Sequence, residues 1–376
     1  MGFVRTLLAL FLALLVSGVS TSAVLILPPP TPQDPLAPKI LSSKGQSLDP
    51  VFSPDGKFIA YSSNLYGDFD IWLMTVDGRN QVRLTCLEGD EKKPQFSPDG
   101  MKIAFIHSSN FGEDIWVVNR DGSNPVKITN NHTPKNKFEW SPNGYLIIYD
   151  TIVNDKWQVW LTSLNKGINI FVGDSEERYA PSWSRNGKFA TCVNKGVKGY
   201  SLELIDVSTN SVEKIYTTSA VIKYPSFFSA DEKILFLRGN GDWSIYTFNI
   251  GNSHITNLFA DPLRYYAGIP WTPILESEVP YATRTKASEL LFVGYSKQGA
   301  ELFILYDDIE IDFKERGVGV IKGSIIERLF TIGHTRINSL SWSQDGHSIL
   351  LSFTEGGYNI LSLLVLEKKK VSPYEK

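Results

Sequence analysis

Several features are scarce in this chain of 376 residues, and each scarcity narrows its class. It has only two cysteines, Cys86 and Cys192, which excludes a disulfide-dense framework, and we expect the pair to be unlinked. Its formal net charge is −3, so it has no basic field for nucleic acid. Its five histidines are scattered and form no metal pair at short helical spacing. No long segment repeats apolar residues with a 3.6-residue period, so helix should be scarce.

The residues that are abundant favour a folded protein made of short strands. Hydrophobic residues make up 42% of the chain and charged residues 20%, so it can bury a large core and is not disordered. Aromatic residues reach 12%, and there are 29 glycines. Many aromatics combined with many glycine-containing turns are typical of all-β architectures.

The N-terminus has the pattern of an export signal. Arg5 precedes an apolar run over residues 7–16, and small residues follow up to Ala23, as in a cleaved signal peptide. The apolar stretch continues through Leu27, so an uncleaved anchor that tethers the chain to a membrane through residues 7–27 is the alternative. We therefore predict a signal peptide or signal anchor over 1–23 and a proline-rich linker over 24–38. Either form makes the protein exported, to the periplasm, the cell surface or the extracellular space.

One short motif recurs along most of the remaining chain. Phe52-Ser-Pro-Asp-Gly56 returns in related form at 96–100, 140–144, 183–187, 228–232 and 342–346. The first five copies lie 43 to 45 residues apart, a period typical of propeller repeats. A degenerate anchor at Trp271 divides the final long gap and leaves a sixth repeat with an insertion.

Each repeat contains four strand-like segments joined by tight turns, which predicts one antiparallel propeller blade. We therefore predict an all-β fold, a β-propeller over residues 39–366 followed by a basic tail over 367–376. Seven blades are expected, with six as the alternative. Residues Lys39–Ser42 resemble a fourth strand, and the last repeat lacks one. This N-terminal strand should therefore complete the last blade and close the ring.

These repeats, with their Asp-Ile-Trp strands (70–72 and 114–116) and the Arg-Leu-Thr strand at 83–85, resemble the WD-like repeats of the TolB β-propeller family. The resemblance covers about residues 39–366 and implies the fold rather than a function. TolB itself has six blades and carries an α/β domain before its propeller. Here only the signal and the linker precede the repeats, so the TolB role and its contact residues are not transferred.

A search for chemistry finds no catalytic constellation, and we predict no catalytic residue, metal ligand or cofactor. The segment Gly294–Gly299 has the wrong spacing for a nucleophile elbow and is interpreted as a hairpin. The aspartates of the Asp-Gly turns are expected to hydrogen-bond their own turn backbone. The acidic insertion over 307–323 is either a solvated loop or a site for a cation or partner.

The best candidate site follows from position in the fold. In a propeller, the segment that leads into each first strand approaches the mouth of the central channel, where basic and aromatic groups can meet an anionic or peptide partner. We predict a partner-binding rim of Lys93, Lys137, Arg178, Tyr179, Lys223, Tyr224, Tyr266 and Arg336.

The sequence therefore favours an exported scaffold that binds a protein or peptide and is not an enzyme. Two alternatives remain. The first is a propeller enzyme of the lyase or lactonase type with a channel metal, and the second is a glycan-binding module that uses the tyrosines of the rim.

Overall fold

The computed structural model describes twelve ranges of the chain, and their regular secondary structure is β-strand throughout. These ranges are 24–27, 39–42, 45–164, 169–174, 176–228, 231–240, 244–257, 289–296, 299–312, 320–331, 336–343 and 348–365. For 24–27, 289–296, 299–312, 320–331, Arg336, Leu340 and Trp342 the backbone alone is described.

Five consecutive four-stranded antiparallel sheets form the blades that follow the regular repeats. The first two blades contain β3 (Ser47–Phe52), β4 (Phe58–Ser63), β5 (Asp70–Thr75) and β6 (Val82–Arg83), then β7 (Asp90–Phe96), β8 (Lys102–Ser109), β9 (Gly112–Asn119) and β10 (Val126–Lys127). The third contains β11 (Phe138–Trp140), β12 (Leu146–Val153), β13 (Lys156–Ser163) and β14 (Asn169–Phe171). The fourth and fifth contain β15 (Glu177–Trp183), β16 (Phe189–Gly196), β17 (Gly199–Asp206) and β18 (Ser211–Thr218), then β19 (Val221–Phe228), β20 (Lys233–Gly239), β21 (Ser244–Asn249) and β22 (Ile255–Asn257).

Two further four-stranded sheets involve both ends of the described chain. The last blade contains β26 (Arg336–Trp342), β27 (Ser348–Glu355), β28 (Tyr358–Val365) and β2 (Lys39–Ser42). In it, β2 pairs antiparallel with β28. This confirms the prediction that the N-terminal strand completes the last blade. The other sheet contains β23 (Glu289–Ser296), β24 (Gly299–Asp312), β25 (Val320–Thr331) and β1 (Val24–Leu27), and β1 pairs parallel with β25. Six antiparallel sheets and this mixed one agree with the predicted number of units.

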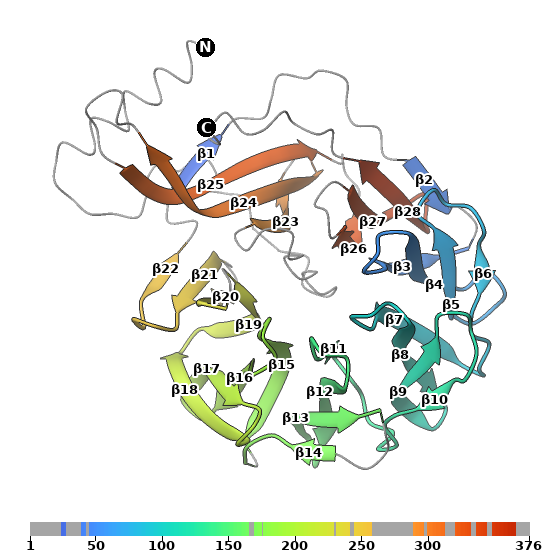
Figure 1. Ribbon diagram of the computed structural model, residues 1–376, viewed down its shortest axis with the longest axis horizontal. Helices are drawn as coiled ribbons and strands as arrows, with labels where there is room; N and C mark the ends of the chain where they lie inside the picture. Colours follow the sequence, from blue (N-terminus) through green and yellow to red (C-terminus); the bar gives the residue numbers. More distant parts are fainter. Residues whose placement is uncertain are drawn as a thin grey trace, which may run out of the picture.

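The sixth repeat contains the largest departure from the regular pattern. Its acidic segment does not begin as a loop, because residues 307–312 continue strand β24, which pairs with β25 as far as Asp312 and Val320. The predicted anchor Trp271 lies outside the described residues. Figure 1 shows the sheets arranged in a circle with β3, β7, β11, β15 and β19 innermost. Because residues 258–288 between β22 and β23 also lie outside the described part, complete closure of the ring stays a prediction.

The repeated turn forms for the reason that the sequence suggested. The backbone N–H of Gly56 donates to the carbonyl of Ser53 at 2.9 Å, and Gly56 has a positive φ of 68° that glycine adopts freely. The carboxylate of Asp55 accepts hydrogen bonds from Ser53 Oγ at 2.6 Å and from the N–H of Lys57 at 3.1 Å. The interpretation of these aspartates as turn residues is therefore confirmed at this turn.

Apolar side chains between neighbouring blades form the core. Ala60 and Ile71 of the first blade pack in one cluster with Ile103 and Phe105 of the second, and all four are fully buried. A similar cluster joins the last blade to the first. Since burial of one large apolar side chain stabilises a fold by about 2–3 kcal/mol, each blade depends on its neighbours for its stability.

Candidate functional site

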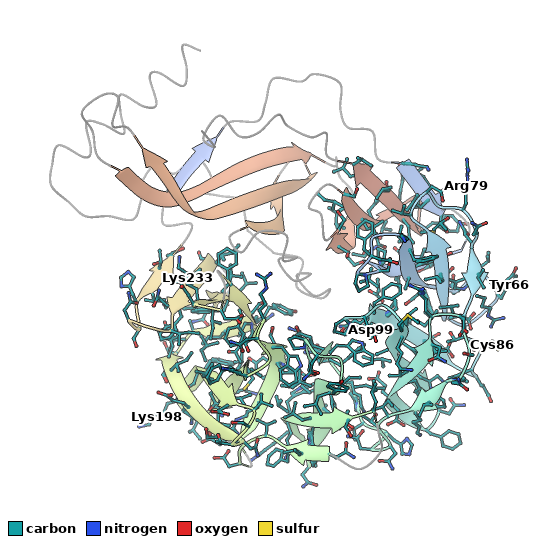
Figure 2. All side chains as sticks on the ribbon, viewed as in Figure 1. Tyr66, Arg79, Cys86, Asp99, Lys198 and Lys233 are labelled. Atoms are coloured by element: carbon teal, nitrogen blue, oxygen red, sulfur yellow. The ribbon has the colours of Figure 1, made fainter. Side chains whose placement is uncertain are left out.

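Because successive strands run in opposite directions, the two faces of the propeller carry different turns. The Ser-Pro-Asp-Gly turns connect first to second strands and define the turn face. The hairpins between second and third strands lie on the opposite face, together with the starts of the innermost strands; in the fourth blade, for example, Glu177 pairs with Lys195 at one end of the blade. We call this side the hairpin face. Tyr66 and Lys198 lie in two of its hairpins, at the outer edge of the ring (Figure 2).

Four innermost strands share a local distortion near this face. Asp49, Lys93, Ala180 and Tyr224 all have positive φ, between 50° and 56°, although none is glycine. Each is followed by proline, and strand pairing skips both residues, as in a β-bulge. Proline is tolerated there because the innermost strand is an edge strand and its missing N–H removes no ladder hydrogen bond. A bulge redirects the side chains beside it, so these four positions shape the channel mouth.

Carboxylates of the preceding blade accept hydrogen bonds from the bulged backbone. Asp49 Oδ2 accepts from the N–H of Lys93 at 3.2 Å, and Asp150 Oδ2 accepts from the N–H of Ala180 at 2.7 Å. Asp150 also accepts from the N–H of Lys137 at 2.6 Å. Left-handed backbone at a non-glycine residue costs on the order of 1 kcal/mol or more, and these inter-blade bonds help to offset that cost.

A surface hollow of about 360 Å³ lies where the third, fourth and fifth blades meet on the hairpin face. We call it the tyrosine hollow. Its lining comes from the starts of innermost strands and from the adjacent hairpins, and consists of Asn136, Trp157, Glu177, Tyr179, Ala180, Lys195, Tyr200, Lys223 and Tyr224. Four aromatic rings and two lysines therefore converge on one opening, in the size range of ligand sites.

Hydrogen bonds and charges hold several of these lining groups in place. The hydroxyl of Tyr179 donates to the carbonyl of Ile222 in the next blade at 3.1 Å. Burial raises the pKa of Tyr179 well above its ordinary value, so the phenol stays neutral. Lys195 Nζ lies 3.4 Å from Glu177 Oε2. Of these two contacts, the Tyr179 hydrogen bond links the fourth blade to the fifth, and the ion pair lies within the fourth blade.

The structure brings part of the predicted rim together. Tyr179, Lys223 and Tyr224 line the tyrosine hollow. Lys93 lies beside it, with its Nζ donating to the carbonyl of Asn136 at 2.7 Å. These residues lie close together because the innermost strands of successive blades all begin on the same face of the ring (Figure 1).

Two other predicted rim residues are not displayed on the surface. Arg178 is only 2% exposed, because its Nε donates to the buried Glu203 and its Nη1 donates to Asp174, each at 2.7 Å. Lys137 is 7% exposed. The prediction that Arg178 meets a partner is therefore corrected: its guanidinium holds the fourth blade together. Of the remaining two, Tyr266 lies outside the described residues, and Arg336 begins β26 with its side chain not described.

The place of Arg178 in its repeat explains why the sequence wrongly predicted an exposed side chain there. Glu91 and Lys135 occupy the equivalent places in the two preceding repeats, and both are buried too. The ammonium of Lys135 donates to the carbonyls of Glu113 and Thr133 and to Asn131 Oδ1, at 2.7, 2.6 and 2.8 Å. In these three repeats the side chain at this place is thus buried.

Sequence reasoning missed Trp157, Lys195 and Tyr200, which reach the tyrosine hollow from hairpins rather than from innermost strands. It also missed the bulges. The recurring proline near the start of the innermost strand was a usable signal, because Pro50, Pro94 and Pro181 each precede the motif's first aromatic residue by two positions.

Among the side chains that the structure describes, no group of three or more His, Cys, Asp or Glu residues is placed to hold a metal ion. None of the described segments forms a helix with the length and apolarity needed to cross a bilayer. Cys86 and Cys192 are free thiols, the first exposed and the second buried.

The comparisons with solved structures show propellers. Oligogalacturonate lyase from Vibrio parahaemolyticus is 12% identical over 89% of this chain and 93% of its own, with a TM-score of 0.61. The β-propeller domain of the trilobed protease from Pyrococcus furiosus is 13% identical over 89% of this chain and 100% of its own, with a TM-score of 0.59. At these identities the likeness concerns the fold alone.

Similarity to TolB itself covers less of the chain. TolB from Acinetobacter baumannii is 21% identical over 57% of this chain, with a TM-score of 0.47, and this chain spans about half, 55%, of that protein. No curated protein matches the sequence. The family model described as the TolB beta propeller domain matches residues 36–229, more than half of the sequence. Repeats, blades and this match agree, and the chain belongs to the TolB beta propeller domain family.

Proposed function

We propose that this propeller is a binding scaffold for a protein or peptide partner and that the partner docks on the hairpin face over the tyrosine hollow. The observation that carries the proposal is the convergence of four aromatic rings and two lysines in one opening. Aromatic residues are enriched in the cores of protein interfaces. The rings of Tyr179 and Tyr224 come from strands of neighbouring blades, so a partner would be held by the rigid part of the fold.

The hairpin face also carries two exposed apolar side chains. Phe111 and Val197 project from hairpins of different blades and are 84% and 106% exposed. Single exposed apolar residues are common on folded proteins, so the proposal rests on the tyrosine hollow and not on these two. The lyase and glycan alternatives are outcomes of the experiments below, because the similarity to oligogalacturonate lyase concerns the fold only.

Affinity capture with paired variants tests this function. The full-length protein serves as bait for extract of the source organism, and bound proteins are identified by mass spectrometry. The double variant Lys223→Glu with Tyr224→Ala should lose the stoichiometric partner. The matched control, Lys188→Glu with Tyr145→Ala, changes two exposed residues beside the turns of the opposite face and should retain it.

A partner retained by both variants, or no stoichiometric partner at all, would refute the proposed binding face. Charge reversal of Arg178 is unsuitable for this experiment, because it removes a buried partner of Glu203 and would unfold the blade.

We also propose that the protein is exported by means of its N-terminal apolar segment, which is preceded by Arg5 and ends with small residues. Cell fractionation and N-terminal sequencing of the mature protein test this. A mature chain that starts after Ala23 supports a cleaved signal, and an intact chain in the membrane fraction supports the anchor. Recovery of the whole protein from the cytoplasm would refute export.

A further inference from the structure

We propose that the tyrosine hollow binds a proline-rich segment of a partner protein in the polyproline II conformation. The four aromatic rings of the hollow receive the proline rings, and Trp157 and Tyr200 donate hydrogen bonds to carbonyl groups of the segment. This inference rests on the proposed function and adds the chemistry of the ligand.

The charges of the hollow are balanced within the protein. Lys195 Nζ lies 3.4 Å from Glu177 Oε2, and Lys223 is not a free cation. Lys93, which lies beside the hollow, is attracted by the carboxylate of Asp49. A ligand charge of either sign therefore gains little there, and the shape and the hydrogen bonds of the ligand decide its binding.

Two lining side chains carry hydrogen-bond donors that the protein does not use. The indole N–H of Trp157 and the hydroxyl of Tyr200 make no hydrogen bond within the part of the chain that the structure describes. The hydroxyl of Tyr179, by contrast, already donates to the carbonyl of Ile222. A ligand that presents carbonyl oxygens can accept from both unused donors, and no existing hydrogen bond has to break.

The acceptors of the same wall are largely occupied. The carbonyl of Asn136 accepts from Lys93 Nζ at 2.7 Å, and the carboxylate of Glu177 is paired with Lys195. The backbone N–H and the side-chain amide of Asn136 both donate to Asp150. A ligand with many N–H or O–H groups, such as an ordinary extended peptide or a sugar, would leave several of its donors without a partner, which costs free energy.

A proline-rich segment matches this pattern of free donors and occupied acceptors. Proline has no N–H, and a polyproline II chain makes no internal hydrogen bonds, so its carbonyls are available to outside donors. Grooves lined by aromatic rings are a recurrent way to bind such segments. One turn contains three residues and is about 9 Å long, which suits a hollow of about 360 Å³.

The aromatic wall is held in place before a ligand binds. Trp157 directly follows the hairpin 153–156, and Tyr200 directly follows the hairpin 196–199; each hairpin is closed by pairing of a second with a third strand. Tyr224 lies in a bulge, with a φ of 50°. Rings positioned in this way lose little conformational entropy on binding, and a polyproline II segment is ordered in advance as well.

Selection from a random dodecapeptide phage library on the immobilised full-length protein tests the proposal. Recovered peptides should be enriched in proline. Fluorescence anisotropy of one recovered peptide then compares the variants. Tyr200→Phe keeps the ring and removes the hydroxyl, so it should weaken binding about fivefold. Trp157→Ala removes a ring and a donor and should weaken binding by more than about tenfold. The matched control Tyr145→Phe, at an exposed tyrosine of the turn face, should leave the affinity unchanged.

Salt dependence separates this ligand from a charged one. Because the charges of the hollow are paired within the protein, the affinity of the recovered peptide should change by less than about twofold between about 50 mM and about 500 mM NaCl. A fall of about tenfold or more would show that charge drives the binding and would overturn the inference.

The remaining outcomes separate the ligand chemistry from the proposed function. Specific peptides without proline enrichment, or wild-type affinity of Trp157→Ala or Tyr200→Phe, would overturn the proline inference and leave the scaffold function standing. Recovery of no specific peptide would overturn it as well, and the affinity capture with paired variants would then decide the scaffold function. Binding of polygalacturonate that depends on Trp157, with no captured protein partner, would overturn both. Circular dichroism of each variant confirms that the fold is retained.

Discussion

Replacing Glu91 by Gln should make the stability of this protein less sensitive to pH. Glu91 and Asp70 are both fully buried at the junction of the first and second blades. Glu91 accepts hydrogen bonds from Thr85 Oγ1 at 2.7 Å and from the N–H of Leu87 at 2.9 Å, and it is hydrogen-bonded to Asp70. Arg83 donates to Asp70 Oδ1 at 2.8 Å. Asp70 Oδ2 has no donor among the described residues unless Glu91 carries a proton.

This arrangement raises the pKa of Glu91 to about 7 from its ordinary 4.5, chiefly because burial disfavours the charged form, with Asp70 adding repulsion. A carboxyl with a higher pKa in the folded chain holds its proton more tightly there. Its contribution to stability is therefore complete below pH 4.5 and is lost as the pH rises through 7. At about 1.4 kcal/mol for each pKa unit, the loss amounts to about 3 kcal/mol.

Glutamine keeps the shape of the side chain and cannot ionise. Its oxygen can accept from Leu87, and its amide can donate to Asp70. Urea unfolding of the wild type and of Glu91→Gln at pH 5 and pH 8 provides the measurement. Between pH 5 and pH 8, the unfolding free energy of the wild type should fall by about 2 kcal/mol more than that of the variant. Glu88→Gln, at an exposed position of the same loop, is the matched control and should follow the wild type. An equal pH dependence of wild type and Glu91→Gln would refute the reasoning.

Three further predictions concern contacts within and between the blades. Trp183→Ala removes a side chain that is 1% exposed and a hydrogen bond of 3.2 Å to the carbonyl of Glu139, so urea unfolding should show a loss of about 3–5 kcal/mol. Lys135→Met removes the donor of three partly buried hydrogen bonds and should lower the unfolding free energy by about 1–3 kcal/mol, whereas Lys135→Arg should recover part of it. Gly112→Ala places a Cβ only 2.0 Å from a backbone carbonyl oxygen, whereas Gly67→Ala at a similar positive φ meets nothing within 4 Å. The first variant should therefore have a midpoint of thermal unfolding several degrees below that of the second, and equal midpoints would contradict this geometry.

The sequence by itself determined the repeated unit. The period of the Phe/Trp-Ser-Pro-Asp-Gly motif predicted the blades, because each turn is a local structure whose hydrogen bonds come from residues two to five positions apart. The last repeat shows three strand-like segments in the sequence, which predicted that Lys39–Ser42 would supply a fourth, and β2 does so. Local turn chemistry and strand counting need no knowledge of distant contacts.

Only the tertiary structure decided which side chains of the channel mouth are exposed at the surface and which are buried. Arg178 and Lys223 look alike in the sequence, yet Arg178 turns inward to Glu203, 25 residues away, and Lys223 lines the tyrosine hollow. The hollow itself joins Trp157 to Tyr224 across three blades. Its shape depends on left-handed bulges and on inter-blade hydrogen bonds, which arise from packing between repeats and leave no local pattern beyond a recurring proline.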